Sequence, residues 1–153
     1  MAVEDVRRFF IERGYKDPVF EMDESSATVD LAAKAVGVEP GRIAKTLAFK
    51  LKDRNILIVT KGDARIDNKK FKSCFKAKAK MLSAEEVLEI TGHPVGGVCP
   101  FGLKEQVDVY LDISLKEYET VFPAAGSGNS ALKISPREMK DLTNADWVDV
   151  CQD

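Results

Sequence analysis

The stretch IAKTLAFKLKDRNILIVT, residues 43–60, decides the fold of this sequence. In its first part, the large apolar residues Leu47, Phe49 and Leu51 alternate onto one face of an extended chain. Ala48 and Lys50 fall on the other face, so this part predicts a β-strand with one buried side. A polar turn follows, and residues 55–60 are rich in β-branched side chains. We therefore predict a β-hairpin.

Lys45 belongs to the same alternation as the buried residues of this strand. Its ammonium group is therefore expected at the end of the apolar face and not on the solvent side. Lysine is rarely buried without a functional or structural partner. Lys45 is the first residue that the pattern marks for function.

Helix signals surround the hairpin. Gly14 ends an apolar stripe over residues 3–13, Ser25 and Ser26 open a second helix that Gly37 ends, and Asp67 caps a short third one. Capping patterns predict two more helices, which begin after Ser83 and Ser135. Further strands are expected at residues 107–111, 131–134 and 147–150. This irregular order predicts an α+β fold, a mixed β-sheet or small closed barrel flanked by helices, and disfavours a doubly wound parallel sheet.

Composition indicates a single domain over residues 1–153. Hydrophobic residues make up 44% of the chain and charged residues 31%, a balance that can bury a core without disulfides. No apolar run is long enough to span a membrane, and the acidic start of the sequence is unlike a secretory signal. Three widely spaced cysteines favour neither disulfides nor a zinc site. We expect a cytoplasmic protein that binds no metal or cofactor.

Two glycine-rich loops are candidates for a binding site. The first is GHPVGGVCPFG, residues 92–102, and the second is the segment 126–129 within AAGSGNSA. Glycines let the backbone approach a ligand closely, and exposed N–H groups can bind a phosphate, a carbonyl or the oxyanion of a tetrahedral intermediate. The alternative for each loop is a structural turn.

Side chains for conventional catalysis are scarce. His93 is the only histidine, and no serine stands in a GxSxG motif, which disfavours a Ser-His-Asp site and a transition-metal site. Cys99 is either a nucleophile or, more in keeping with its tight loop, a small packing residue. An enzyme with this sequence would depend on backbone electrostatics and on Lys45, which can hold a phosphate or polarise a carbonyl.

Six lysines crowd into residues 69–80, at positions 69, 70, 72, 76, 78 and 80. Such a run can neutralise the phosphates of a nucleic acid, or it can simply be a solvated face. The overall charge of −2 does not decide between the two.

Three motifs together resemble the YbaK/ProX family of aminoacyl-tRNA deacylases, which also occurs as an editing domain inserted in bacterial prolyl-tRNA synthetases. They are VEPGRIAKTLAFK at residues 38–50, GHPVGGVCPFG, which matches the pattern GxxxGGxxPxG, and FPAAGSGNSALKISP at residues 122–136. The resemblance covers nearly the whole chain, and the motifs occur in the family's order.

This resemblance implies a trans-editing hydrolase that cleaves the ester between a wrongly attached amino acid and the 3′ end of a tRNA. Its partner would be aminoacyl-tRNA, and docking on an aminoacyl-tRNA synthetase stays open. The amino acid (cysteine, alanine, serine or threonine) and the nucleophile, water or a substrate group, stay open too. The alternative is a noncatalytic module that senses an aminoacyl or nucleotide ligand.

The resemblance also assigns roles to individual residues. Lys45 becomes the catalytic anchor of the substrate, and Lys69, Lys70 and Lys72 become contacts to the tRNA backbone. The residues implied in substrate binding are Thr46, Gly96, Gly97, Val98, Pro100, Phe101, Gly102, Gly126, Ser127, Gly128 and Asn129.

Overall fold

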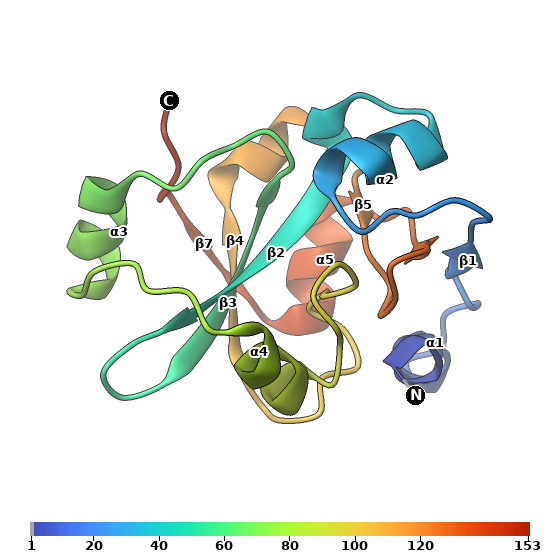
Figure 1. Ribbon diagram of the computed structural model, residues 1–153, viewed down its shortest axis with the longest axis horizontal. Coiled ribbons are helices and arrows are strands. Elements are labelled where there is room, and N and C mark those ends of the chain that lie inside the picture. The colour runs from blue at the N-terminus through green and yellow to red at the C-terminus, as the bar shows by residue number, and fades with distance from the viewer. Residues whose placement is uncertain (1) are drawn as a thin grey trace.

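A computed structural model describes residues 2–153 of the protein as five α-helices around a mixed sheet (Figure 1). The helices are α1 (Ala2–Glu12), α2 (Val29–Val36), α3 (Asn68–Phe75), α4 (Ala84–Thr91) and α5 (Pro136–Thr143). The strands are β1 (Phe20–Glu21), β2 (Ile43–Lys50), β3 (Asn55–Lys61), β4 (Asp108–Asp112), β5 (Phe122–Pro123), β6 (Ser130–Ala131) and β7 (Asp146–Val148). Two short 3-10 helices, η1 (Pro40–Arg42) and η2 (Ile113–Glu117), precede β2 and follow β4.

The main sheet has the strand order β5-β2-β3-β4-β7. The predicted hairpin forms its centre, with β2 and β3 antiparallel in a register that places Lys45 opposite Thr60. The other three pairings are parallel. The α+β prediction is confirmed, and of its two alternatives the mixed sheet is the one found, because β5 and β7 are edges that do not close into a barrel.

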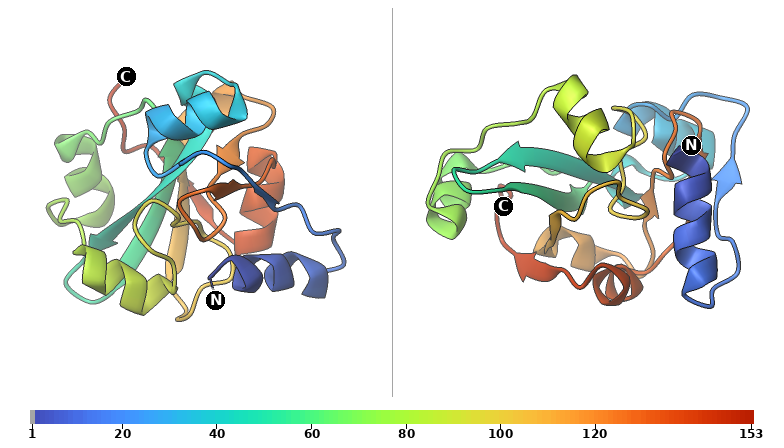
Figure 2. Two further views of the ribbon diagram at one scale, coloured as in Figure 1. Left: turned by 45° about the vertical axis from the view of Figure 1, so that its right-hand side comes forward. Right: turned by 90° about the horizontal axis from the view of Figure 1, so that it is seen from below.

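Both faces of the hairpin are covered, which corrects the expectation of one buried side. Ile56 and Ile58 face a cluster that contains Phe71 of α3, whereas Leu57 and Val59 face the main core. Figure 2 shows α4 and α5 on opposite sides of the hairpin. Ala48, which was expected on the solvent face, is therefore buried in the main core.

Most helix boundaries follow the predicted capping residues. Asp67 and Ser83 accept hydrogen bonds from the first turns of α3 and α4, and Ser83 forms the complete capping box with Glu86. The second helix is the exception, because it begins at Val29 with Thr28 as its N-cap. The Ser26 N–H donates instead to the carbonyl of Gly128 at 2.6 Å, which ties residues 26–28 to the second glycine loop.

The outer edge of β2 is only partly paired. β5 pairs with Ile43 and Ala44 alone, and pairing resumes where Leu82 N donates to Ala48 O. Thr46 lies between these points. Alternate residues of a strand direct their backbone groups to the same side, so the N–H and C=O of Thr46 point away from β3, as the carbonyl of Ala48 does. The sheet thus has a gap at Thr46.

Candidate substrate pocket

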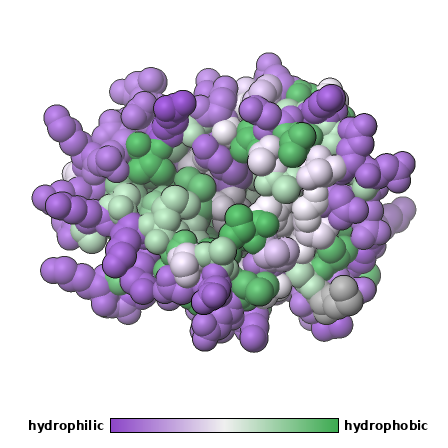
Figure 3. All heavy atoms as spheres, viewed as in Figure 1, coloured by the Kyte–Doolittle hydropathy of each residue, from purple (hydrophilic) through white to green (hydrophobic). Residues whose placement is uncertain are grey.

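A pocket of about 430 Å³ occupies this gap in the sheet edge, and we call it the β2 pocket. Its floor is β2, and its walls come from α2, from the start of α4, from the first glycine loop and from residues that flank the second loop. Figure 3 shows the face of the molecule on which these elements lie, hollowed between α2 and α4. The lining residues are Ser26, Ala27, Thr28, Val29, Ala32, Val36, Ile43, Ala44, Lys45, Thr46, Leu47, Ala48, Met81, Leu82, Ala84, Val87, Val95, Gly96, Val98, Phe122, Ala124, Ser130 and Ala131.

Two hydroxyl groups in this mostly apolar lining have no hydrogen-bond partner among residues 2–153. They are Ser26 Oγ and Thr46 Oγ1, and both oxygens are buried. Ser26 as a residue is only 6% exposed. Buried hydroxyls normally find partners, and leaving one without a partner costs about 1–3 kcal/mol. Their shared place in one pocket indicates that they serve a polar ligand.

Lys45 brings a positive charge to the same strand segment. Its Nζ donates to the carbonyl of Ala64 at 2.5 Å, and no carboxylate within residues 2–153 forms an ion pair with it. Burial lowers the pKa of Lys45, and the nearby Cys151 and Asp63 oppose this shift in part. An ammonium group that is partly desolvated and has a neutral partner can bind an anionic or carbonyl oxygen of a ligand.

The two glycine loops meet backbone to backbone. Gly126 N donates to Gly97 O at 2.9 Å, and a Cβ on Gly97 would lie 2.5 Å from Ser127 N. Only glycine fits at Gly97 without separating the loops. Of the predicted loop residues, Gly96 and Val98 line the pocket, whereas Gly97 and Gly126 are buried where the loops meet.

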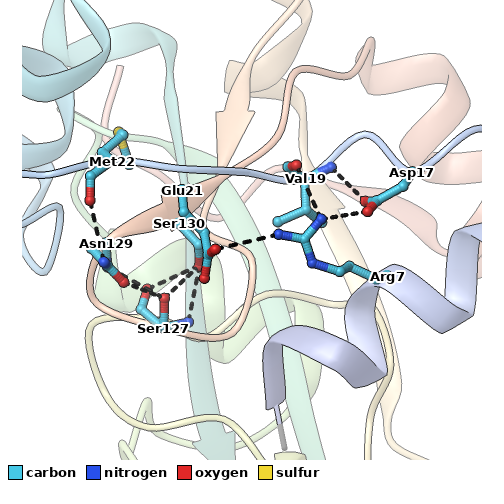
Figure 4. Close-up of polar contacts among 8 residues, drawn as sticks. All are labelled: Arg7, Asp17, Val19, Glu21, Met22, Ser127, Asn129 and Ser130. Carbon is cyan, nitrogen blue, oxygen red and sulfur yellow. Dashed lines mark hydrogen bonds and ion pairs between the residues drawn. The ribbon is translucent and has the colours of Figure 1, made fainter.

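The second glycine loop holds a segment that forms one pocket wall. We call residues 17–28 the strap. Asn129 bonds to the strap twice, since Met22 N donates to Asn129 O at 2.7 Å and Asn129 Nδ2 donates to Met22 O at 3.2 Å (Figure 4). Ser127 Oγ donates to Asn129 Oδ1 at 2.8 Å. Ser127, Gly128 and Asn129 therefore lie behind the strap and position it, and they do not line the pocket.

Arg7 of α1 fixes the other end of the strap. Its guanidinium forms ion pairs with Asp17 and Glu21 and donates to the carbonyl of Val19 (Figure 4). This role was not predictable from the sequence, because Arg7 stands among ordinary surface charges of a helix. Ser26 was missed for another reason: a serine ahead of a helical pattern indicates an N-cap more directly than a pocket residue.

The end of the first glycine loop turns away from the β2 pocket. Phe101 is fully buried against Phe9 and Phe10 of α1. Gly102 has a φ of +61° and lies so close to α1 that a Cβ would be 2.6 Å from Asp5 O. Pro100, Phe101 and Gly102 thus connect the loop to α1, and none of the three lines the pocket.

His93 and Cys99 are buried beneath the same loop. His93 Nε2 lies 2.7 Å from Phe101 O, and burial lowers the pKa of the imidazole. Burial raises the pKa of the Cys99 thiol to about 12. Cys99 is thus held as a thiol and packs in the loop, which fits the second of the two roles considered for it.

The three lysines predicted to contact tRNA lie on α3, outside the pocket. Lys69 and Lys72 are exposed, but Lys70 Nζ lies 3.1 Å from Asp149 Oδ1 and 2.7 Å from Asp153 Oδ1. These carboxylates raise the pKa of Lys70 and offset its charge. Elsewhere, no group of three His, Cys, Asp or Glu side chains in residues 2–153 could hold a metal ion, and no helix there is long and apolar enough to cross a membrane.

The fold is α+β, and it holds a pocket at a sheet edge. Residues 23–142 match the model of the aminoacyl-tRNA editing domain. The chain belongs to this family, as its three motifs predicted.

Its relatives agree with this assignment. The chain is 51% identical over 155 residues to the uncharacterized protein YwhH of Bacillus subtilis, covering 100% of this chain and 99% of the relative. It is 29% identical over 138 residues to EbsC of Enterococcus faecalis, named as a proposed Cys-tRNA(Pro)/Cys-tRNA(Cys) deacylase, covering 89% and 84% of the two chains. A crystal structure of a proposed trans-editing enzyme for prolyl tRNA synthetase superposes with a TM-score of 0.90 at 32% identity, over 99% of this chain and 98% of that one.

Proposed function

We propose that this protein is a trans-editing deacylase, which hydrolyses the ester between a mischarged amino acid and the 3′-terminal ribose of a tRNA. The observation that carries the proposal is the β2 pocket, where Ser26 Oγ and Thr46 Oγ1 are buried without partners beside the partly desolvated Lys45. Membership of the editing-domain family supports it. Residues 1–153 act as one domain in this proposal, since the main core takes residues from Val6 to Ala145.

Lys45 anchors the substrate in this mechanism. Its ammonium group binds either the terminal phosphate of the tRNA or the reacting carbonyl oxygen. The phosphate carries a negative charge, and the carbonyl oxygen gains one in the transition state. The N–H of Thr46 lies beyond the last pairing with β5 in residues 2–153, and it is a backbone donor for the same purpose. Because these donors are fixed before the substrate arrives, they need little reorganisation during the reaction.

Hydrolysis itself needs no side-chain nucleophile. Water, or a group of the substrate, attacks the acyl carbon; with water, the ester C–O bond breaks, the ribose oxygen takes a proton and the free amino acid leaves. The apolar lining of Val29, Ala32 and Val98 suits a small amino-acid side chain, and such a pocket separates neighbours by about 1–3 kcal/mol per methylene.

Deacylation of a panel of mischarged tRNAs tests this function. The wild type is compared with Lys45→Ala and with Lys52→Ala, a matched control on an exposed lysine of the β2–β3 turn. We expect the wild type and Lys52→Ala to cleave at least one ester faster than background and Lys45→Ala to lose most of that activity. Binding of the charged tRNAs without cleavage by any variant would contradict the deacylase and favour a noncatalytic sensor.

A further inference from the structure

We propose that the 3′ strand of the tRNA leaves the β2 pocket along Lys80, Lys78 and Lys76, and not along α3. This lysine track, residues 76–80, is an interaction surface for a single-stranded phosphodiester chain. The inference rests on the proposed function, because it takes the ligand of the pocket to be the end of such a chain. It replaces the tRNA contact that the sequence placed at Lys69, Lys70 and Lys72.

The track has one charged side and one packed side. Lys76, Lys78 and Lys80 are exposed, while Ala77 and Ala79 between them are half-buried against the cluster that contains Phe71. Lys78 and Lys80 lie in an extended stretch, in which alternate residues point the same way and are separated by about 6.6 Å. Lys76 precedes this stretch as the C-cap of α3, with a φ of +59°. The small alanines pack against the cluster, and the lysines stay on the solvent side.

The track is tied to the pocket by the edge of β2. Lys50 N donates to Lys80 O at 2.8 Å, and Met81 bridges to Phe49. Met81 lines the pocket and is 58% exposed, so it stands at the mouth. Figure 1 shows this segment running from α3 to α4 across the front of the sheet. A strand that leaves the pocket past Met81 meets Lys80 first.

The charges of the track differ from that of Lys70 on α3. Within the part of the chain that the structure describes, no carboxylate forms an ion pair with Lys76, Lys78 or Lys80, whereas Lys70 is paired with Asp149 and Asp153. In Figure 3, hydrophilic side chains project on the left-hand side, where α3 and this segment lie in Figure 1.

Two other segments beside the mouth carry acidic residues. The strap ahead of Ser26 carries the exposed residues Asp23 and Glu24, and the first turn of α4 carries the exposed Glu85, whereas Glu86 is paired with Lys50. A polyanion is repelled from Asp23, Glu24 and Glu85 and attracted to the lysine track. Charge therefore favours an exit along the track.

Two double variants with the same charge change test the route. K78Q/K80Q removes two charges of the track, and K69Q/K72Q removes two exposed charges of α3. The probe is an RNA hairpin with a single-stranded ACCA tail, and binding is followed by fluorescence anisotropy between 50 and 200 mM salt. The slope of log K against log[salt] is negative, and each lost phosphate contact on a single strand reduces its magnitude by about 0.7, so K78Q/K80Q should reduce the magnitude by about 1.4. When the salt is raised from 50 to 200 mM, the affinity of K78Q/K80Q should therefore fall by a factor about 7-fold smaller than the factor for the wild type.

K69Q/K72Q should keep the slope of the wild type. Equal slopes for wild type and K78Q/K80Q, or a change in K69Q/K72Q as large as in K78Q/K80Q, would overturn the proposed route. Because the probe carries no amino acid, binding is measured apart from cleavage. If the salt slope changes in K78Q/K80Q but the wild type cleaves no ester, the proposed function is wrong and the lysine track stands. If the wild type cleaves an ester but the slope is unchanged in K78Q/K80Q, the lysine track is wrong and the proposed function stands.

Discussion

Thr46→Val should make the protein more stable and less active. Thr46 Oγ1 is buried and has no hydrogen-bond partner among residues 2–153, so the hydroxyl contributes nothing to the folded state that offsets its loss of hydration. Valine has nearly the same shape and replaces the hydroxyl with a methyl group, so the change opens no cavity. The expected sign is therefore opposite to that of most substitutions in a protein interior.

The magnitude follows from the cost of an unsatisfied buried hydroxyl, which is about 1–3 kcal/mol. Removing that cost should raise the free energy of unfolding by the same amount. For a domain of this size, 1 kcal/mol shifts Tm by about 2–4 °C, so Tm should rise by about 2–12 °C. Deacylation should slow, because the hydroxyl that the pocket holds for its ligand is gone.

Thr91→Val is the matched control. Thr91 is fully buried, and its Oγ1 donates to Val87 O at 2.6 Å and accepts from His93 N at 3.0 Å. The same chemical change here leaves the buried N–H of His93 without its acceptor and should lower the free energy of unfolding by about 1–3 kcal/mol. Differential scanning calorimetry of both variants decides the matter. A fall in Tm for Thr46→Val comparable to that of Thr91→Val would refute the reasoning, because the Thr46 hydroxyl would then have a structural partner.

Three further perturbations test the framework of the site. Gly97→Ala should force the two glycine loops apart and cost about 1–3 kcal/mol from overpacking, seen as a lower Tm, whereas Gly128→Ala meets only ordinary contacts and should be mild; equal effects would contradict the loop contact. Burial lowers the pKa of His93, so the unfolded state binds the proton more readily. The free energy of unfolding, measured in urea, should therefore decrease as the pH is lowered from about 7.5 to about 5.5. An equally steep decrease in His93→Gln would show that other groups cause it. Asn129→Asp loses one bond to the strap and should raise KM and proteolysis within residues 17–28, an effect that the exposed control Asn68→Asp should not share.

The local features of the fold were predictable because each rests on neighbouring residues. The hairpin follows from alternation and from the turn, and the helices that follow Asp67, Ser83 and Ser135 start at side chains that accept hydrogen bonds from their first turns. The burial of Ala48 was not predictable in this way. It depends on a second layer packed against the sheet, and alternation reports only which residues share a face.

The candidate site was predictable in part. Motifs placed Lys45, Thr46, Gly96 and Val98, all of which line the pocket. The same motifs could not separate residues that face the pocket from those that hold it, such as Phe101, because both kinds occur within a few positions of one loop. That distinction depends on which way each residue points, and this is set by contacts with α1 far away in sequence.

The unsatisfied polar groups of the pocket explain why contacts outside the lining hold its walls in place. Ser26 and Thr46 lose hydration without gaining a partner among residues 2–153, and Lys45 is partly desolvated, so this lining is less stable than an apolar one of the same shape. A flexible wall would collapse to satisfy these groups with its own backbone. The contact of Gly97 with the second loop and the bonds of Asn129 to the strap prevent this by fixing both walls. Variants of the framework should therefore disturb binding and cleavage together, whereas loss of one pocket hydroxyl should weaken activity and leave the walls in place.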